Sequence, residues 1–234
     1  MKAYKRIDEI CNAVSFASKK FDGKIVVADI GTDHGYVAEK LSKFENIKKV
    51  IATDISDKSL AKLNTLINLR KLKNIETLVG DGLIPINKAD VCVIAGMGGL
   101  EISKIIDNQN DINGKKKCNI FVLQPTQNIV ELKMWATKSH FKILKDITIE
   151  DSDRFYPILI IDVSKSGFYK KSIFNLWLGR DSKEKIEDFN KYILYLNEYL
   201  SFMENVSKKR LKNDKILLQK YKLNKLIKKY INKK

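Results

Sequence analysis

The 234-residue sequence predicts an α/β fold: a seven-stranded sheet with helices on both faces, followed by a C-terminal helical region. Three observations predict it. Between residues 24 and 139, short apolar segments alternate with helical ones, which is typical of parallel βαβ units. Two apolar segments near residue 150 are then separated only by a short acidic turn, which indicates an antiparallel pair. Beyond about residue 170, strand signals disappear.

The elements follow in chain order. Residues 4–20 have the spacing of an amphipathic helix, with Ile7, Ile10 and Val14 on one face. We expect parallel strands at 24–30, 48–55, 75–81, 89–96 and 118–125. Helices should connect them at about 35–44, 57–72, 100–106 and 129–139, and Ser56 is suited to cap the second of these. Strands at 141–150 and 154–164 close the sheet, and His140 before them has a structural role.

The C-terminal region has a heptad pattern. Its apolar residues are spaced alternately three and four apart: Ile186, Phe189, Ile193, Leu196, Leu200 and Met203. A second helix, at about 207–232, has a less regular seam through Ile216, Leu223, Ile227 and Tyr230. We expect the two helices to fold back as an antiparallel coiled-coil pair, so the chain divides into an α/β domain at 1–166 and a helical domain at 167–234. One longer helix used for dimerisation is the alternative, although we favour a monomer.

Composition excludes several classes of protein. No apolar run approaches the roughly 20 residues of a membrane-spanning helix. The charged N-terminal segment does not read as a secretion signal. The cysteines at 11, 92 and 118 are far apart and outside any C-x-x-C pair, so we expect buried, reduced thiols, no bound metal and a cytoplasmic protein.

The positive charge is concentrated towards the C-terminus. The net charge is +16; residues 1–166 carry 26 Lys and Arg against 21 Asp and Glu, whereas residues 167–234 carry 18 against 7. Such an excess favours a polyanionic partner, above all nucleic acid. AT-rich coding also raises the lysine content, but it does not explain why the acids become fewer towards the C-terminus.

Acidic residues follow three successive strands. Asp29 and Gly31 follow the first strand, Asp54 the second, and Asp81 the third. Ligands of open α/β sheets bind beyond these strand ends. The first loop reads D-x-G-x-x-x-G rather than G-x-G-x-x-G, and no phosphate-binding P-loop is present, which disfavours a dinucleotide or a nucleoside triphosphate.

Three acids instead suit a cationic cofactor without phosphate. Asp29 would lie near an ammonium group, Asp54 would accept from two ribose hydroxyls, and Asp81 would accept from an adenine amino group. This set describes S-adenosylmethionine. The alternative for each acid is a local one, a helix cap or an Asx turn.

The fourth strand ends in a run of glycines, Gly96-Met97-Gly98-Gly99. This run is denser than a turn requires and suggests close approach to the backbone. A [DN]-P-P-[YFW] peptide, which serves the methylation of exocyclic amines, is missing from this position. Its absence favours a ring nitrogen as the methyl acceptor.

The motifs "DIGTDHGY", "ATDI", "GDGL", "AGMGG" and "LQP", in this order, resemble those of the bacterial tRNA (adenine-22-N1)-methyltransferase family, known as TrmK. The resemblance covers the whole chain. It implies a Rossmann-like class I methyltransferase with a coiled-coil C-terminal domain, which methylates N1 of an adenine in the tRNA D-loop. It also implies a set of cofactor-binding residues: Asp29, Gly31, Asp33, Gly35, Asp54, Asp81 and Gly82, with Gly96 and Met97 in the wall of the site.

Several residues are candidates for contact with the substrate. Asp33 could stabilise a product that becomes cationic, and His34 could touch substrate or brace its turn. Tyr36, Phe155 and Tyr156 could stack on a base turned out of the RNA. Gln124, at the end of the fifth strand, could donate a hydrogen bond to it. Further substrate contacts are expected from Gly98 and Gly99 and, along the tRNA backbone, from Lys208, Lys209, Arg210, Lys212, Lys228 and Lys229.

Two other functions remain open at this point. The chain could methylate another RNA base. It could also methylate a small molecule or a protein, in which case the basic C-terminus would not be needed. It could also be a non-catalytic RNA-binding protein that does not bind S-adenosylmethionine.

Overall fold

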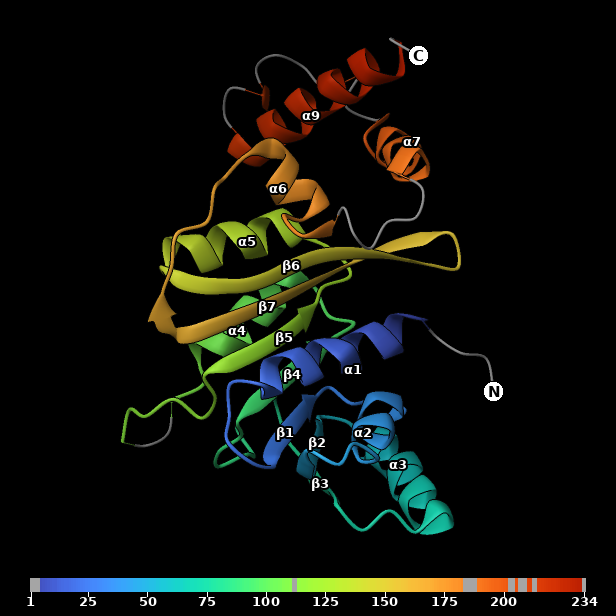
Figure 1. Cartoon of the computed structure of the whole chain (residues 1–234), viewed down its shortest axis with the longest axis vertical. Coiled ribbons are helices and arrows are strands. Elements are labelled where there is room, and N and C mark those ends of the chain that lie inside the picture. Colours follow the sequence, from blue (N-terminus) through green and yellow to red (C-terminus); the bar gives the residue numbers. More distant parts are fainter. Residues whose placement is uncertain are drawn as a thin grey trace.

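The computed structural model describes residues 5–110, 113–182, 189–201, 205, 210–211 and 214–232. Its centre is a seven-stranded sheet with the strand order β3-β2-β1-β4-β5-β7-β6 (Figure 1). Strands β1 to β5 are parallel, and β7 runs antiparallel to β5 and to β6. The predicted α/β sheet with an antiparallel closing pair is therefore confirmed.

The strands are β1 (Ile25–Ile30), β2 (Ile47–Asp54), β3 (Ile75–Val79), β4 (Val91–Ala95), β5 (Ile120–Gln124), β6 (Phe141–Asp151) and β7 (Arg154–Ser166). The helices of this region are α1 (Lys5–Ser18), α2 (Tyr36–Leu41), α3 (Asp57–Arg70), α4 (Gly99–Asp107) and α5 (Ile129–Lys138). Each predicted element is present, with its ends shifted by a few residues. Ser56 caps α3, as predicted, by accepting from the backbone N–H of Ser59.

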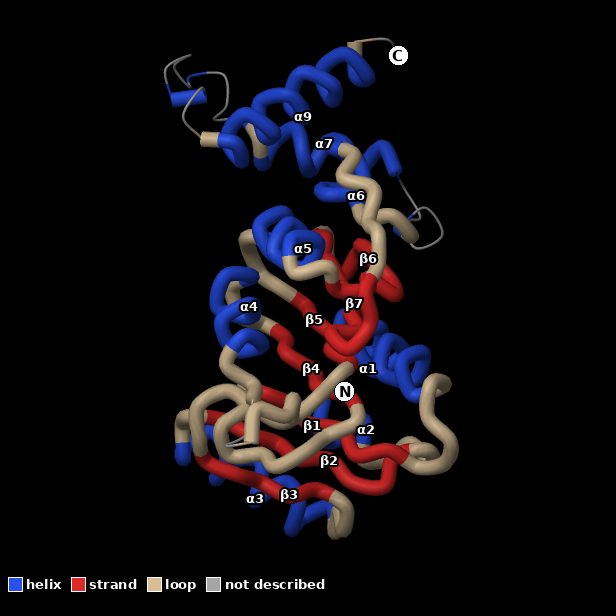
Figure 2. Tube along the Cα trace, turned by 90° about the vertical axis from the view of Figure 1, so that its left-hand side faces the viewer, coloured by secondary structure: helices blue, strands red, loops and turns tan. Residues whose placement is uncertain are grey.

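Helices cover both faces of the sheet. On one face, α1, α2 and α3 pack over strand residues such as Val27 and Val122. On the other face, α4 and α5 pack over Ile94 and Phe121. Figure 2 shows α4 and α5 on one side of the strands and α1 on the other. This alternation of buried side chains fixes the register of every strand, so the strand ends meet at one defined edge.

The C-terminal region is helical, but it contains more than the two predicted helices. In the described part of the chain beyond Ser166 there is no strand, and the helices are α6 (Ile173–Leu178), α7 (Phe189–Tyr199) and α9 (Lys215–Ile231). The extra helix, α6, is a single turn and a half and lies between α5 and α9. It is too short to produce a clear helical period in the sequence.

Helices α7 and α9 pack against each other. The described side chains of the two predicted seams are buried: Ile193, Leu196 and Leu200 on α7, and Leu223 and Ile227 on α9. The rest of the predicted pattern lies outside the described part, namely Ile186, Met203, the helix start at 207–209, and the side chains of Phe189, Ile216 and Tyr230.

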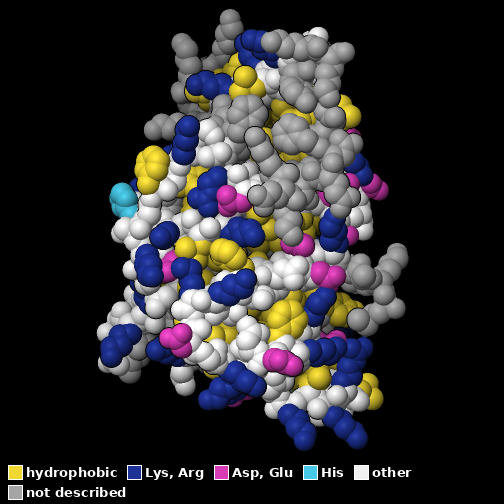
Figure 3. Space-filling model, viewed as in Figure 1, with side chains coloured by type: hydrophobic (Ala, Val, Ile, Leu, Met, Phe, Trp, Pro, Cys, Tyr) yellow, Lys and Arg dark blue, Asp and Glu magenta, His cyan; other side chains and the backbone are white. Residues whose placement is uncertain are grey.

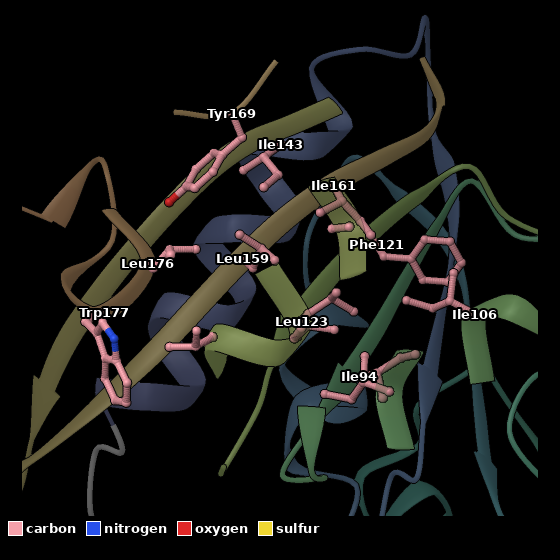
Figure 4. Packing of buried hydrophobic residues seen from close by; sticks show 14 of the residues in the cluster. Ile94, Ile106, Phe121, Leu123, Ile143, Leu159, Ile161, Tyr169, Leu176 and Trp177 are labelled. Carbon is pink, nitrogen blue, oxygen red and sulfur yellow. The ribbon is translucent and has the colours of Figure 1, made fainter. Parts of the chain in front are cut away.

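The helical region shares one hydrophobic core with the sheet. Tyr169, Leu176 and Trp177 belong to the same buried cluster as Leu159 and Leu123 of the sheet (Figure 4). The chain after residue 166 is therefore packed onto the α/β core, and no flexible linker separates the two within the described residues.

A buried polar network also fastens this junction. Lys133 Nζ on α5 lies 2.8 Å from Asp146 Oδ1 on β6 and donates to the Asn175 carbonyl at 3.0 Å. The other Asp146 oxygen accepts from the Tyr169 hydroxyl and from the Arg180 backbone N–H. Burial lowers the pKa of Lys133, an effect that the Asp146 carboxylate opposes. The network orders the segment that leads into the helical region.

Two further predictions concern composition. Cys11, Cys92 and Cys118 are all buried thiols, as expected. Among the described helices, none has both the length and the apolar composition that crossing a bilayer requires.

Candidate active site

A cavity of about 440 Å³ lies at the carboxyl ends of β1, β4 and β5. The strand order reverses between β1 and β4, and this is the point at which open α/β sheets bind their ligands. The volume is within the usual range for small-molecule sites. The lining residues come from α1, the β1–α2 loop and the ends of β4 and β5: Arg6, Ile7, Ile10, Asp29, Gly31, Thr32, Asp33, His34, Tyr36, Val37, Ala95, Gly96, Met97 and Gln124.

Asp29 places a buried carboxylate in the wall of this cavity. Its side chain is 3% exposed and accepts from the Thr32 hydroxyl at 2.7 Å. Burial raises its pKa to about 6, against the effect of the hydrogen bonds from Thr32 and from the Ala38 backbone. At neutral pH, Asp29 is therefore mainly a buried anion, and a cation beside it would be favoured.

The loop after β1 is tightly constrained. Gly31 has φ +68°, a backbone conformation that favours glycine, and a Cβ at this position would displace the Met97 methyl group. Asp33 also has positive φ, and its carboxylate accepts from His34 Nδ1 at 2.6 Å. The His34 ring stacks on Tyr36 with centroids 5.8 Å apart. Asp33, His34 and Tyr36 thus form one exposed polar and aromatic cluster along the cavity.

Asp54 braces the same loop from the neighbouring strand. Its Oδ2 accepts from the Asp33 backbone N–H at 3.0 Å, and its Oδ1 accepts from the Ser56 backbone N–H at 2.8 Å. The local Asx-type role that was the alternative for this residue is therefore present. Each carboxylate oxygen still has a second lone pair that can accept from a ligand.

Asp81 lies one strand further along the edge. Asp54 pairs in register with Val79, the last residue of β3, and Asp81 is an exposed residue two positions later. Neither Asp54 nor Asp81 lines the cavity. Neighbouring strands are about 4.8 Å apart, so the ends of β1, β2 and β3 span roughly 10 Å, which suits an extended ligand rather than a compact one.

The close approach expected at the glycine run after β4 is present at Gly99. A Cβ at Gly99 would overlap the Asn128 carbonyl, and the Gly99 N–H donates to the Gln127 carbonyl at 2.9 Å. The element that closely approaches the glycines is therefore the protein's own β5–α5 loop. Gly96 and Met97 line the cavity, whereas Gly98, Gly99, Gly35 and Gly82 do not.

Gln124 presents an acceptor in addition to the amide group that was expected to donate. It is 1% exposed, and its Nε2 donates to the Pro125 carbonyl at 2.9 Å. Its Oε1 has no hydrogen-bond partner among the described residues. A buried carbonyl oxygen without a partner, in the wall of a cavity, is suited to accept a hydrogen bond from a ligand.

Sequence reasoning did not single out six residues of the cavity wall: Arg6, Ile7, Ile10, Thr32, Val37 and Ala95. The amphipathic pattern of α1 shows that Ile7 and Ile10 face the sheet, but not that they face its carboxyl edge. Thr32 lies within the quoted loop motif, which is the signal that could have found it.

Two predicted aromatic contacts lie elsewhere. The Tyr156 ring lies beneath the Arg6 guanidinium, 5.0 Å away, and Phe155 is buried in the core. Neither lines this cavity, so Tyr36 is the aromatic candidate that does. Among the predicted basic contacts, Arg210 and Lys229 are exposed and Lys228 is half-buried, whereas Lys208, Lys209 and Lys212 lie outside the described residues.

The residues present fit S-adenosylmethionine. The cavity has a buried acid for a cationic group, further acids along the same edge, and a loop without the glycine pattern that binds phosphates. No group of three His, Cys, Asp or Glu residues in the described part is arranged to hold a metal ion.

The fold and the site together define a Rossmann-like methyltransferase. The profile of the methyltransferase domain family matches residues 4–159. A candidate tRNA methyltransferase of Mycoplasma genitalium is 33% identical over 171 residues, which are 70% of this chain and 72% of that protein. The chain therefore belongs to the methyltransferase domain family and, within it, to the tRNA methyltransferases.

Two further proteins are similar. The tRNA (adenine(22)-N(1))-methyltransferase of Bacillus subtilis is 30% identical, and the match covers 58% of each chain. The structure of Mycoplasma capricolum TrmK with S-adenosylhomocysteine has a TM-score of 0.70 at 24% identity and covers 94% of this chain and 96% of its own. The first supports the resemblance found in the motifs, and the second shows the same fold.

Proposed function

We propose that this protein transfers a methyl group from S-adenosylmethionine to N1 of an adenine in the D-loop of tRNA, namely adenine 22. The observation that carries the proposal is the cavity at the strand ends, with the buried Asp29 carboxylate in one part of its wall and the unpartnered Gln124 acceptor in another. The Bacillus subtilis relative is named for this reaction.

The cofactor would be held along the edge from β3 to β4. Asp29 would attract its ammonium group, Asp54 would accept from its ribose hydroxyls, and Asp81 would accept from its adenine amino group. Gly31, Asp33, Gly35, Gly82, Gly96 and Met97 would surround it. When bound, S-adenosylmethionine supplies an electrophilic methyl group on a sulfonium centre.

The target base would lie towards β5. N1 of neutral adenine carries an in-plane lone pair and no proton, so the protein needs no general base and its task is alignment. Gln124 Oε1 would accept from the exocyclic amine next to N1, and the Tyr36 ring would pack on the base. The Asp33 carboxylate, oriented by His34, would stabilise the positive charge that the ring gains.

The helical region would hold the tRNA backbone. Its exposed basic residues would make phosphate contacts, which position RNA without reading its sequence. The heptad spacing and the buried seam residues of α7 and α9 support coiled-coil packing of these helices. A monomer acting on cytoplasmic tRNA is the assembly that we propose.

The test is methyl transfer to an unmodified tRNA transcript, with the product digested and analysed by mass spectrometry. A methyl group on N1 of adenine 22 is the expected result, and a transcript with that adenine replaced by guanine is the control. A methyl group found on another atom, or none at all, would disprove the proposal.

A further inference from the structure

A second cavity, which we call the aromatic cavity, lies between the β5–α5 loop and the helical region. Its volume is about 100 Å³, well below the range of ordinary small-molecule sites and suited to a single planar ring. Its wall contains five aromatic side chains: Phe155, Trp177, Tyr192, Tyr195 and Tyr199. Such a wall is typical of sites that hold unstacked nucleobases.

The rings come from three elements that converge at this point. Tyr192, Tyr195 and Tyr199 are three and four residues apart, so they share one face of α7. Phe155 of β7 packs against Tyr192 and Tyr195, with centroid distances of 4.4 and 5.1 Å. These rings therefore pack against one another and form one aromatic surface.

Trp177 and Tyr199 form the less tightly packed part of the wall. Their ring centroids are 6.4 Å apart and their planes are tilted by 54°, so they are not stacked on each other. Tyr199 is about half exposed, whereas Trp177 is 6% exposed. Both side chains line the aromatic cavity, so a ring bound there would contact both of them.

The Trp177 indole N–H is buried and has no hydrogen-bond partner among the described residues. The other tryptophan, Trp135, donates from its Nε1 to the Asp107 carboxylate at 3.2 Å. Buried indole groups usually find an acceptor. A ligand with a ring nitrogen or carbonyl oxygen would supply the acceptor that Trp177 lacks.

The position of the aromatic cavity relates it to the proposed catalytic site. Gln124 lines the first cavity, and Pro125, the next residue, lines the second. One loop thus borders both cavities, as neighbouring nucleotides of one strand would require. The Lys220 ammonium lies 5.8 Å from the Trp177 ring and adds positive charge near a bound strand.

We propose that the aromatic cavity binds a second, unstacked base of the tRNA, close in the strand to the target adenine. The base stacks on Tyr199 and accepts a hydrogen bond from Trp177 Nε1. Because every base has a π-face and an acceptor atom, this contact positions the strand and gives little sequence selection. The inference rests on the proposed function.

The experiment uses the full chain with Trp135→Phe. The sequence has two tryptophans, so Trp177 is then the only one left. Titration with unmodified tRNA is expected to quench the Trp177 fluorescence. In the same background, Tyr199→Ala should reduce the quenching and weaken tRNA binding at least about fivefold. Trp177→Phe in the wild-type chain keeps a ring but removes the donor; it should raise the KM for tRNA and leave S-adenosylmethionine binding unchanged.

The matched control is Phe168→Ala, which removes an aromatic ring that is 91% exposed and outside the aromatic cavity. It should leave tRNA binding unchanged. The inference is overturned if Tyr199→Ala and Trp177→Phe melt like the wild type and methylate tRNA with unchanged KM. If the wild-type protein does not methylate tRNA, the proposed function fails, and this inference fails with it.

Discussion

The ionised Asp29 carboxylate lowers the stability of the ligand-free protein but favours the binding of a cationic ligand. Its pKa in the folded chain, about 6, is above the ordinary value of 3.8, so the folded state binds the proton more tightly. The free energy of unfolding therefore falls as pH rises from about 4 to about 6, and the destabilisation is complete above pH 6. At neutral pH the buried Asp29 carboxylate therefore destabilises the ligand-free protein, and a bound cationic ligand would offset this loss.

Asp29→Asn is predicted to stabilise the ligand-free protein at pH 7.5 while weakening cofactor binding. A difference of about two pKa units corresponds to an upper limit of roughly 3 kcal/mol. Urea unfolding at pH 7.5 and at pH 4 measures the effect, which should be present at the first pH and absent at the second. Equal stability of the two proteins at both values would contradict the assignment.

The affinity for S-adenosylmethionine should decrease when the pH is lowered. At pH 5, one unit below the Asp29 pKa of about 6, most of the carboxyl groups are protonated and the affinity should be roughly tenfold lower than at pH 7.5. Isothermal titration at both pH values tests this. The weak residual binding of Asp29→Asn should lack this pH dependence.

Gln124 is predicted to act on the substrate and not on the cofactor. Gln124→Met conserves the volume of the side chain but removes the Oε1 acceptor, so kcat/KM for tRNA should fall about tenfold. The dissociation constant for S-adenosylmethionine should not change. A variant that methylates tRNA at the wild-type rate would remove Gln124 from the site.

These residues were found from the sequence to different degrees. The D-x-G and strand-end motifs placed Asp29, Gly31 and Asp33 on the first cavity because parallel strands end at one edge. The same reasoning could not show that the Gln124 amide donates to Pro125, since this depends on a side-chain torsion. Nor could it show that Gly99 makes room for Asn128, because that contact joins two loops 29 residues apart.

Among the elements, the contact between α5 and β6 could not be predicted from sequence patterns. Lys133 and Asp146 are fully buried and oppositely charged, but a lysine in an amphipathic helix is normally read as exposed. Helix α6 was missed for a related reason, since it is defined by its contacts with α5 and α9 and not by its own periodicity.

The buried pair predicts a strong and selective effect on stability. Lys133→Ala leaves the Asp146 carboxylate buried without its partner, and it should lower the free energy of unfolding by about 3–5 kcal/mol. Lys49→Ala, which breaks the exposed pair with Glu76, should lower it by less than about 1 kcal/mol. Denaturant titration of both variants makes the comparison, and equal effects would contradict the buried network.

At the scale of the whole molecule, the helical region cannot be treated as a detachable tail. Trp177, Leu196 and Leu223 complete the core that covers one face of the sheet, so removal of residues 170–234 would expose that core. Basic side chains are also scattered over the sheet region of the face in Figure 3, and are not confined to the helices. Point substitutions are therefore better probes of tRNA contact than truncation.

Arg210→Gln with Lys229→Gln should weaken tRNA binding more at low salt than at high salt. Both side chains are exposed, so their loss removes phosphate contacts without disturbing the core. The slope of log K against log salt should become shallower by about one for each lost contact. Binding measured between 50 and 200 mM salt tests this, and an unchanged slope would exclude these two residues from the RNA interface.

The most direct test of the account is the titration of S-adenosylmethionine into the wild-type protein and into the single variants Asp29→Asn, Asp54→Asn and Asp81→Asn. If the three carboxylates bind one ligand, the wild type should have one binding site. Each variant should then bind S-adenosylmethionine about tenfold or more weakly than the wild type does. No binding to the wild type, or wild-type affinity in the Asp54 and Asp81 variants, would contradict it.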